Sequence, residues 1–340
     1  MRIKKLIHKL TCLGEYLFYV GTIFFFFDIF IFHNLFGYGY PRHYKEENIQ
    51  RYPAPYVMFT GKPNVEDHNK LGFRGKSFEE CSPESFKIAF FGGSTGYNGE
   101  PPIAEILENE LTNLIETKVC VANFSVVSSN HRQHLHGILE YLPQAKPDLV
   151  LFYGGYNENV SAGYFDPRPG YTYNYFYRAE TPTISKFFME HSALIGEFDK
   201  KFGIITGIKK IRDKEQPFSE SWNNRITAKY FDTLQLASQI SSSLLSVHCG
   251  TTQFLAFYQP YIVPSQFLTA HEKIRKFIRG IPYIFDVSSE YDELGKDTVF
   301  TDPVHVNQTA RGRMGKKLAE IVSNELAQGT LSNTCFLHSN

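Results

Sequence analysis

The sequence predicts an α/β protein with a mostly parallel sheet covered by helices on both faces, preceded by a separate apolar segment. From residue 87 onward, short apolar runs alternate with amphipathic segments, which is the pattern of parallel strands joined by crossover helices. The chain has 340 residues, enough for one large domain or two small ones. An aromatic share of 16% is too high for a disordered chain.

Residues 1–36 are predicted to be a cytoplasmic basic tail and a transmembrane anchor. An apolar run from Tyr16 to Phe32, with its flanks, reaches the ~20 residues that cross a bilayer as a helix. No small-residue cleavage site follows it, which favours an uncleaved anchor over a cleaved signal peptide. A core or interfacial helix is the other alternative. Basic residues precede the run, so we expect the rest of the chain on the exported side. Asp28 is the weak point, since a carboxylate at depth costs roughly 2.5–3.5 kcal/mol.

Residues 37–80 are predicted to be a tether and lead-in segment, residues 81–330 the globular domain and residues 331–340 a tail. The expected strands cover residues 87–91, 119–123, 148–153, 253–258 and 281–287. The expected helices cover 103–115, 135–142, 226–244 and 308–327. The apolar period changes from continuous short runs to helical spacing at each of these boundaries.

Residues 160–222 interrupt the alternation of strands and helices. The stretch is aromatic and irregular at first and then more basic. We interpret it as an insertion over the active edge of the sheet that forms a lid or a substrate wall. The alternative is a packed decoration without substrate contact.

Charge and cysteine content exclude several classes of protein. Lys and Arg number 35, and so do Asp and Glu, so no overall field attracts nucleic acid. Five scattered cysteines without C-x-x-C exclude a disulfide-dense scaffold and a zinc finger. Cys81, Cys120 and Cys249 could pair in an oxidising compartment. Because Cys120 and Cys249 lie in or near apparent core strands, we expect buried free thiols instead.

The first candidate catalytic residue is Ser94, in the sequence Gly-Gly-Ser-Thr-Gly at residues 92–96. A serine at a strand-to-helix turn between glycines exposes its hydroxyl beside free backbone N–H groups. Acyl transfer needs this combination of a nucleophile and donors for an oxyanion. A phosphate-binding P-loop would need a lysine before the serine or threonine, and residues 92–96 contain no lysine.

The strand at 148–153 ends in Gly-Gly-Tyr-Asn-Glu, residues 154–158. Asn157 can aim its amide at a developing oxyanion, or it is a turn residue that caps its own backbone. Gly155 and Tyr156 beside it are candidate substrate-binding residues. Ligands of such sheets bind beyond the carboxyl ends of the strands, where these residues are expected.

The sequence Asp-Pro-Val-His, residues 302–305, precedes the last predicted helix. His305 could take the serine proton, and Asp302 could orient its ring and stabilise the imidazolium. Asp302 could equally cap the following helix. The segment Asn-Phe-Ser-Val-Val-Ser at residues 123–128 offers a further backbone N–H at the same edge.

In this order, the four segments resemble the blocks of the SGNH (GDSL-like) hydrolase superfamily, over roughly residues 87–325. The resemblance implies that Ser94 is the nucleophile, with His305 and Asp302 completing a triad. It also implies an oxyanion hole formed by the N–H groups of Ser94 and Ser128 and by the Asn157 side chain. Ser128 replaces the family glycine, with Ser125 as an alternative register. The implied fold is a three-layer α/β/α sandwich with a flavodoxin-like sheet.

Residues 55–59 and 69–75 look like the lead-in of membrane-anchored, cell-envelope members of this superfamily. The resemblance therefore implies an esterase or deacylase acting on O-acyl esters of envelope carbohydrate or lipid, without cofactor or metal. The alternatives are an O-acyltransferase that uses the same residues and a non-catalytic carbohydrate-binding or assembly protein.

Two further features have alternative interpretations. His131 and His134 have the one-turn spacing of metal ligands, but a solvated helix start is the interpretation we favour. Gln259 directly follows the strand at 253–258. It either lines the pocket or only marks where the strand stops.

Overall fold

The computed structural model describes residues 2–36, 49–329 and 331, which belong to two compact units. The smaller unit comprises residues 1–45 and 175–214, and the larger unit comprises residues 46–174 and 215–340. Residues 37–48, which begin the predicted tether and lead-in segment, lie outside the described residues. The predicted tail also lies outside them, except for residue 331. The boundaries at residues 36, 80 and 330 stay predictions.

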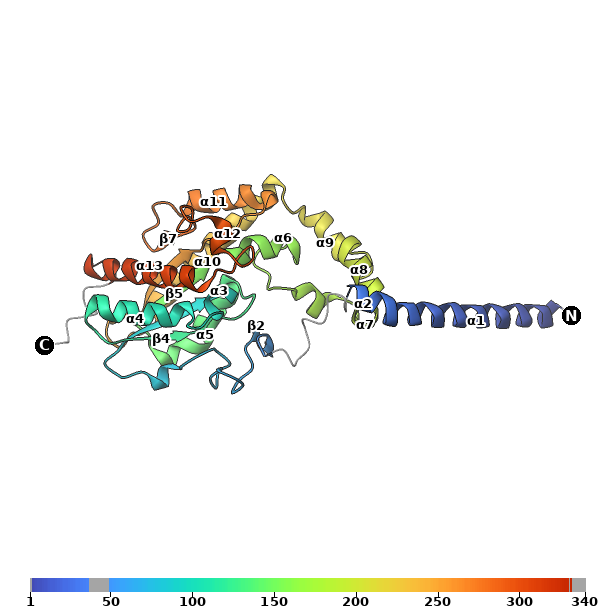
Figure 1. The fold of residues 1–340 in the computed structure, drawn as a ribbon, viewed down its shortest axis with the longest axis horizontal. Helices are drawn as coiled ribbons and strands as arrows, with labels where there is room; N and C mark the ends of the chain where they lie inside the picture. Colours follow the sequence, from blue (N-terminus) through green and yellow to red (C-terminus); the bar gives the residue numbers. More distant parts are fainter. Residues whose placement is uncertain (1, 37–48, 330, 332–340) are drawn as a thin grey trace. The chain divides into compact units, whose positions relative to one another are not determined.

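The larger unit contains a five-stranded sheet in the order β4-β3-β5-β6-β7 (Figure 1), with all neighbouring strands parallel. The strands are β3 (Phe86–Gly92), β4 (Val119–Asn123), β5 (Leu149–Gly154), β6 (Gln253–Tyr258) and β7 (Ile284–Asp286). The predicted α/β class and five strands are confirmed. β7 is shorter than the predicted 281–287, because Ile281 and Ile284 form turn hydrogen bonds and Pro282 has no N–H to donate.

Helices cover both faces of this sheet and form three layers. Residues of β3 alternate between the faces, as the two-residue period of a strand requires. Ile88 and Phe90 pack with α4 (Ile103–Ile115) and α13 (Gln308–Ala327). Ala89 and Phe91 pack on the other face. That face is covered by α5 (His131–Ala145), α10 (Glu220–Ser243) and α11 (Leu268–Ile278).

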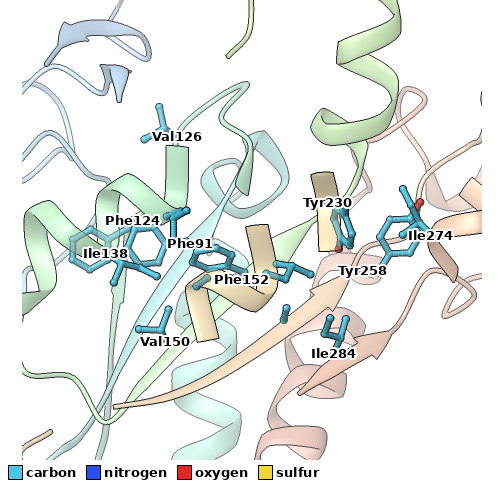
Figure 2. Packing of buried hydrophobic residues seen from close by; sticks show 14 of the residues in the cluster. Phe91, Phe124, Val126, Ile138, Val150, Phe152, Tyr230, Tyr258, Ile274 and Ile284 are labelled. Carbon is cyan, nitrogen blue, oxygen red and sulfur yellow. The ribbon is translucent and has the colours of Figure 1, made fainter. Parts of the chain in front are cut away.

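Aromatic side chains fill the core under the carboxyl ends of β3 and β5 (Figure 2). The Phe91 ring stacks on Phe124 at 4.9 Å and meets Phe152 edge-on at 5.5 Å between ring centroids. All three side chains are buried, and burial of each contributes about 1.5–3 kcal/mol. This packing holds the two strands firmly where they end.

The lead-in segment is attached to the sheet by a disulfide. It contains β1 (Tyr52–Ala54), antiparallel β2 (Met58–Thr60) and the short helix η3 (Phe78–Glu80). Cys81 follows η3 and is bonded to Cys120 of β4, with a Cα–Cα distance of 5.9 Å. The predicted free thiols are therefore wrong for this pair, and Cys249 is also disulfide-bonded. The physical reason is that β4 is an edge strand, so a neighbouring segment can reach its cysteine.

The remaining helices of the larger unit are short. They are α3 (Ser94–Tyr97), η4 (Asn157–Ser161), α6 (Ala162–Tyr164), η6 (Ser265–Phe267) and α12 (Lys296–Val299). Two of them, α3 and η4, begin directly at sequence motifs of the candidate site.

The smaller unit is helical. It contains α1 (Arg2–Phe27), the π-helical turn η1 (Asp28–Phe32), α2 (His33–Phe36), η5 (Phe176–Glu180), α7 (Thr183–His191), α8 (Ala193–Phe202) and most of α9 (Ile208–Glu215). Residues His8–Phe32 are long and apolar enough to cross a membrane. Much of the predicted irregular insertion is thus a series of short helices.

Candidate active site

Ser94 is the first residue of α3, directly after β3 and Gly93. At this position its N–H has no partner within the helix. The flanking glycines allow close approach: a Cβ on Gly93 would lie 2.5 Å from Asn157 Nδ2, and one on Gly96 would collide with Ser125 Oγ. The turn therefore presents a serine hydroxyl beside the Asn157 amide, together with an N–H that has no acceptor among the described residues.

A chain of hydrogen bonds joins Ser94 to residues more than two hundred positions later. His305 Nε2 lies 2.7 Å from Ser94 Oγ, and His305 Nδ1 lies 2.6 Å from Asp302 Oδ2. The carboxylate can only accept, so a neutral ring carries its proton on Nδ1. His305 Nε2 is then the acceptor for the serine hydroxyl.

The Asp302 carboxylate is fixed by its own loop. Its Oδ1 accepts from the N–H groups of Val304 and His305, both at 2.8 Å. Desolvation alone would raise the Asp302 pKa, but the hydrogen bonds from His305 and Val304 lower it below its ordinary value. The group is therefore ionised at neutral pH and can stabilise an imidazolium.

Ser128 has a left-handed backbone, with φ of 66°, which costs a non-glycine residue about 1–2 kcal/mol. Its hydroxyl accepts a hydrogen bond from Arg51 Nη2 at 3.0 Å. Within the described parts of the chain, the Ser128 N–H has no acceptor. The alternative register is less suitable, because the Ser125 N–H already donates to Asn123 Oδ1 at 3.1 Å.

The Asn157 side chain is held from both ends of its amide. Nδ2 donates to the Ser129 carbonyl at 2.7 Å, and Oδ1 accepts from the Ser161 hydroxyl at 3.1 Å. An amide nitrogen has two protons, so one remains for a ligand. The amide therefore binds the backbone of Ser129 and does not cap the backbone of its own turn.

The two residues before Asn157 shape the turn after β5. Gly155 has a φ of 130°, and a Cβ there would collide with the Tyr258 ring. Burial raises the pKa of the Tyr156 hydroxyl, and its ring packs edge-on against Tyr261 at 5.4 Å. Beyond β6, Gln259 accepts from the Thr95 hydroxyl at 3.0 Å, which places it next to the turn of the candidate nucleophile.

His131 and His134 are buried, so the predicted solvated helix start is wrong. The ring of His131 packs against Phe152 and against Tyr230 of α10, and α10 covers this end of α5. The two rings meet through their Nδ1 atoms at 3.1 Å. Desolvation lowers the pKa of each to about 3, so both are neutral.

These histidines belong to a buried polar network that contacts Asn157 through Ser129. The sequence motifs did not predict this network. His134 Nε2 lies 2.8 Å from Ser129 Oγ, and the Ser129 carbonyl accepts from Asn157. Glu158 accepts from the N–H groups of Gly155 and His131. Across the described ranges, no group of three His, Cys, Asp or Glu residues has the arrangement of a metal site. The network therefore supports the position of Asn157.

No family model and no curated protein sequence matches this chain. Among solved structures, it is similar to the lipase Lip_vut3 from a goat rumen metagenome, at 13% identity and a TM-score of 0.42, covering 69% of this chain and 97% of that one. It is also similar to the acetylxylan esterase Axe2 from Geobacillus stearothermophilus, at 13% identity and a TM-score of 0.41, covering 71% and 96%. A third is the M. Smegmatis aryl esterase, at 12% identity and a TM-score of 0.40, covering 71% and 99%.

Proposed function

We propose that the protein is a serine esterase that hydrolyses O-acyl esters of cell-envelope carbohydrate or lipid. The observation that carries this proposal is the chain of hydrogen bonds from Ser94 through His305 to Asp302. Acyl transfer uses this arrangement, in which a carboxylate orients a base and the base takes the proton of a nucleophile.

In the proposed reaction, Ser94 Oγ attacks the ester carbonyl while its proton moves to His305 Nε2. Asp302 stabilises the resulting imidazolium. The carbonyl oxygen becomes an oxyanion, which accepts hydrogen bonds from the N–H groups of Ser94 and Ser128 and from Asn157 Nδ2. His305 then gives its proton to the leaving alcohol, and an acyl-enzyme remains.

Water resolves the acyl-enzyme in the second half of the reaction. His305 takes one proton from the water, whose oxygen attacks the acyl carbon. The bond from that carbon to Ser94 Oγ then breaks, His305 Nε2 returns its proton to Ser94 Oγ, and the carboxylic acid leaves. If a sugar hydroxyl replaces water, the same residues perform O-acyl transfer. The substrate class rests on the resemblance of residues 55–59 and 69–75 to membrane-anchored envelope enzymes, and on a helix at His8–Phe32 that is suited to a membrane.

The direct test is labelling of the full-length protein with a fluorophosphonate, together with hydrolysis of a soluble aryl acetate. Ser94→Ala should abolish labelling and lower kcat/KM by at least about 10³-fold, since removing a nucleophile leaves only binding and oxyanion stabilisation. Ser242→Ala, on an exposed serine of α10, is the matched control and should label normally. Undiminished labelling of Ser94→Ala would remove Ser94 from this role.

The acceptor is tested separately from the nucleophile. With an acylated envelope oligosaccharide, an esterase releases free carboxylic acid. A transferase instead moves the acyl group to an added unmodified oligosaccharide.

A further inference from the structure

Two neighbouring helices of the smaller unit expose large apolar side chains. On α7, Ile184, Phe187 and Phe188 are 74%, 56% and 45% exposed. On α8, Phe198 and Phe202 are each 45% exposed. Their spacings of three and four residues place them on one face of each helix. Exposed phenylalanines this concentrated mark an interaction surface.

One of these helices, α8, contacts the end of the apolar N-terminal helix. α8 packs against η1 and α2, next to one end of α1 (Figure 1). The Leu194 N–H, in the first turn of α8, donates to Asp28 Oδ1 at 2.9 Å. Asp28 is only 2% exposed, whereas Phe25 of α1 is 58% exposed. The carboxylate thus finds its partner at the N-terminus of α8, where the helix dipole favours an anion.

This contact fixes the depth of α8 relative to the apolar span. Asp28 lies inside the stretch His8–Phe32, four residues before its end. At 1.5 Å per residue, the first turn of α8 is about 6 Å inside that boundary. If the span crosses a bilayer, α8 and the adjoining α7 are at the level of the lipid headgroups and upper acyl chains.

The charges of α8 and α9 fit the same location. Lys200 and Lys201 are exposed in the last turn of α8, and Lys209 and Lys210 are exposed on α9. The Lys201 ammonium lies 5.4 Å from the centre of the Phe202 ring. A lysine beside an exposed phenylalanine suits a membrane interface, because the ammonium can reach the headgroups while the ring stays in the apolar region.

We infer that α7 and α8 form a second membrane contact, in which Ile184, Phe187, Phe188, Phe198 and Phe202 enter the lipid interface beside the end of the N-terminal helix. The inference rests on the membrane anchoring in the proposed function and goes beyond it. The insertion then places a second part of the chain on the bilayer surface, in addition to the single span.

Depth-dependent quenching tests this contact in full-length protein reconstituted into phosphatidylcholine–phosphatidylglycerol vesicles. The chain has one tryptophan, Trp222, which is fully buried, so each variant adds one new reporter. Phe187→Trp and Phe198→Trp report on the two helices, and Phe25→Trp reports on the N-terminal helix. Leu245→Trp, at a residue 63% exposed in the larger unit, is the matched control.

Brominated phospholipids should quench the added emission of Phe187→Trp and Phe198→Trp, as they quench Phe25→Trp, and should leave Leu245→Trp unchanged. Quenching of Phe25→Trp alone would overturn the second contact and keep the anchor. Absence of quenching in all three would remove both the anchor and the inference. Aryl-acetate hydrolysis by each variant reports that its larger unit is folded.

Discussion

Ser128 is a serine in a backbone conformation that favours glycine. Its φ of 66° suits glycine better than serine, and its hydroxyl accepts a hydrogen bond from Arg51. The Arg51 guanidinium carbon also lies 5.1 Å from the centre of the Tyr173 ring. We therefore expect Arg51 to act through Ser128, as a positioning residue for the proposed oxyanion donor.

Arg51→Ala should lower kcat more than it raises KM. If the strain at Ser128 is about 1–2 kcal/mol, the loss in kcat/KM is roughly 5- to 30-fold. Ser128→Gly should suppress the effect of Arg51→Ala, because glycine adopts this conformation without support. Steady-state kinetics of the two single variants and the double variant measure the coupling.

Arg279→Ala removes an exposed arginine after α11 and serves as the control. If Arg51→Ala causes the same loss in the parent chain as in the Ser128→Gly variant, Arg51 does not act through this turn.

For single residues, the sequence predicts the motifs of the candidate site better than it predicts contacts between residues far apart in the chain. The serine, asparagine and Asp-x-x-His segments follow predicted strands or precede a helix, so their common edge could be inferred. Arg51 could not, because its contact with Ser128 spans 77 residues and leaves no periodic signal. The burial of His131 could not be predicted from the sequence either, because it depends on packing against Tyr230 of α10, which is distant in the chain.

Among the elements, the start of α5 should make stability depend on pH. His131 and His134 have folded pKa values of about 3 and an unfolded value near 6.5. Between these values the unfolded chain binds more protons, so the free energy of unfolding falls as pH decreases from about 6.5 toward 3. Each histidine contributes at most about 1.4 kcal/mol per pH unit. Burial raises the pKa of Glu158, which opposes this trend just above pH 4.5.

Denaturant unfolding at several pH values checks this expectation. His134→Gln should lower stability at neutral pH and should reduce its slope between pH 6.5 and 4. His191→Gln, at an exposed position on α7, should leave the slope unchanged. An unaltered slope in His134→Gln would contradict the buried, neutral state of His134.

The strands were predictable because each is a short apolar run that ends in a polar or glycine-rich turn. α11 was missed, since its buried residues Ala270, Ile274 and Ile278 are interspersed with charged side chains after a proline-rich stretch. The helices of residues 175–214 were missed because α7, α8 and α9 have only 9, 10 and 8 residues, too few for a sustained helical period to stand out.

On the scale of the whole molecule, the Cys81–Cys120 bond closes a loop with a sequence separation of 39. A cross-link of this size stabilises a fold by about 4 kcal/mol in the chain-entropy model. Replacing both cysteines by serine should therefore lower the free energy of unfolding by about 2–5 kcal/mol. Urea unfolding of the full-length chain measures the change.

Cys12→Ser is the control, since Cys12 is exposed and free. A double variant as stable as the parent would show that the lead-in segment is held without the disulfide. Disulfides persist in oxidising compartments, so the bond also supports the proposed export of the larger unit.

The strand order β4-β3-β5 has a consequence for how such a chain can change. The turns after these three adjacent strands bring together every atom proposed to meet the oxyanion, so the lengths of the intervening connections matter little. Residues 175–214 enter the chain after the last of these turns. A change in the length of that stretch therefore leaves the three proposed oxyanion donors in place.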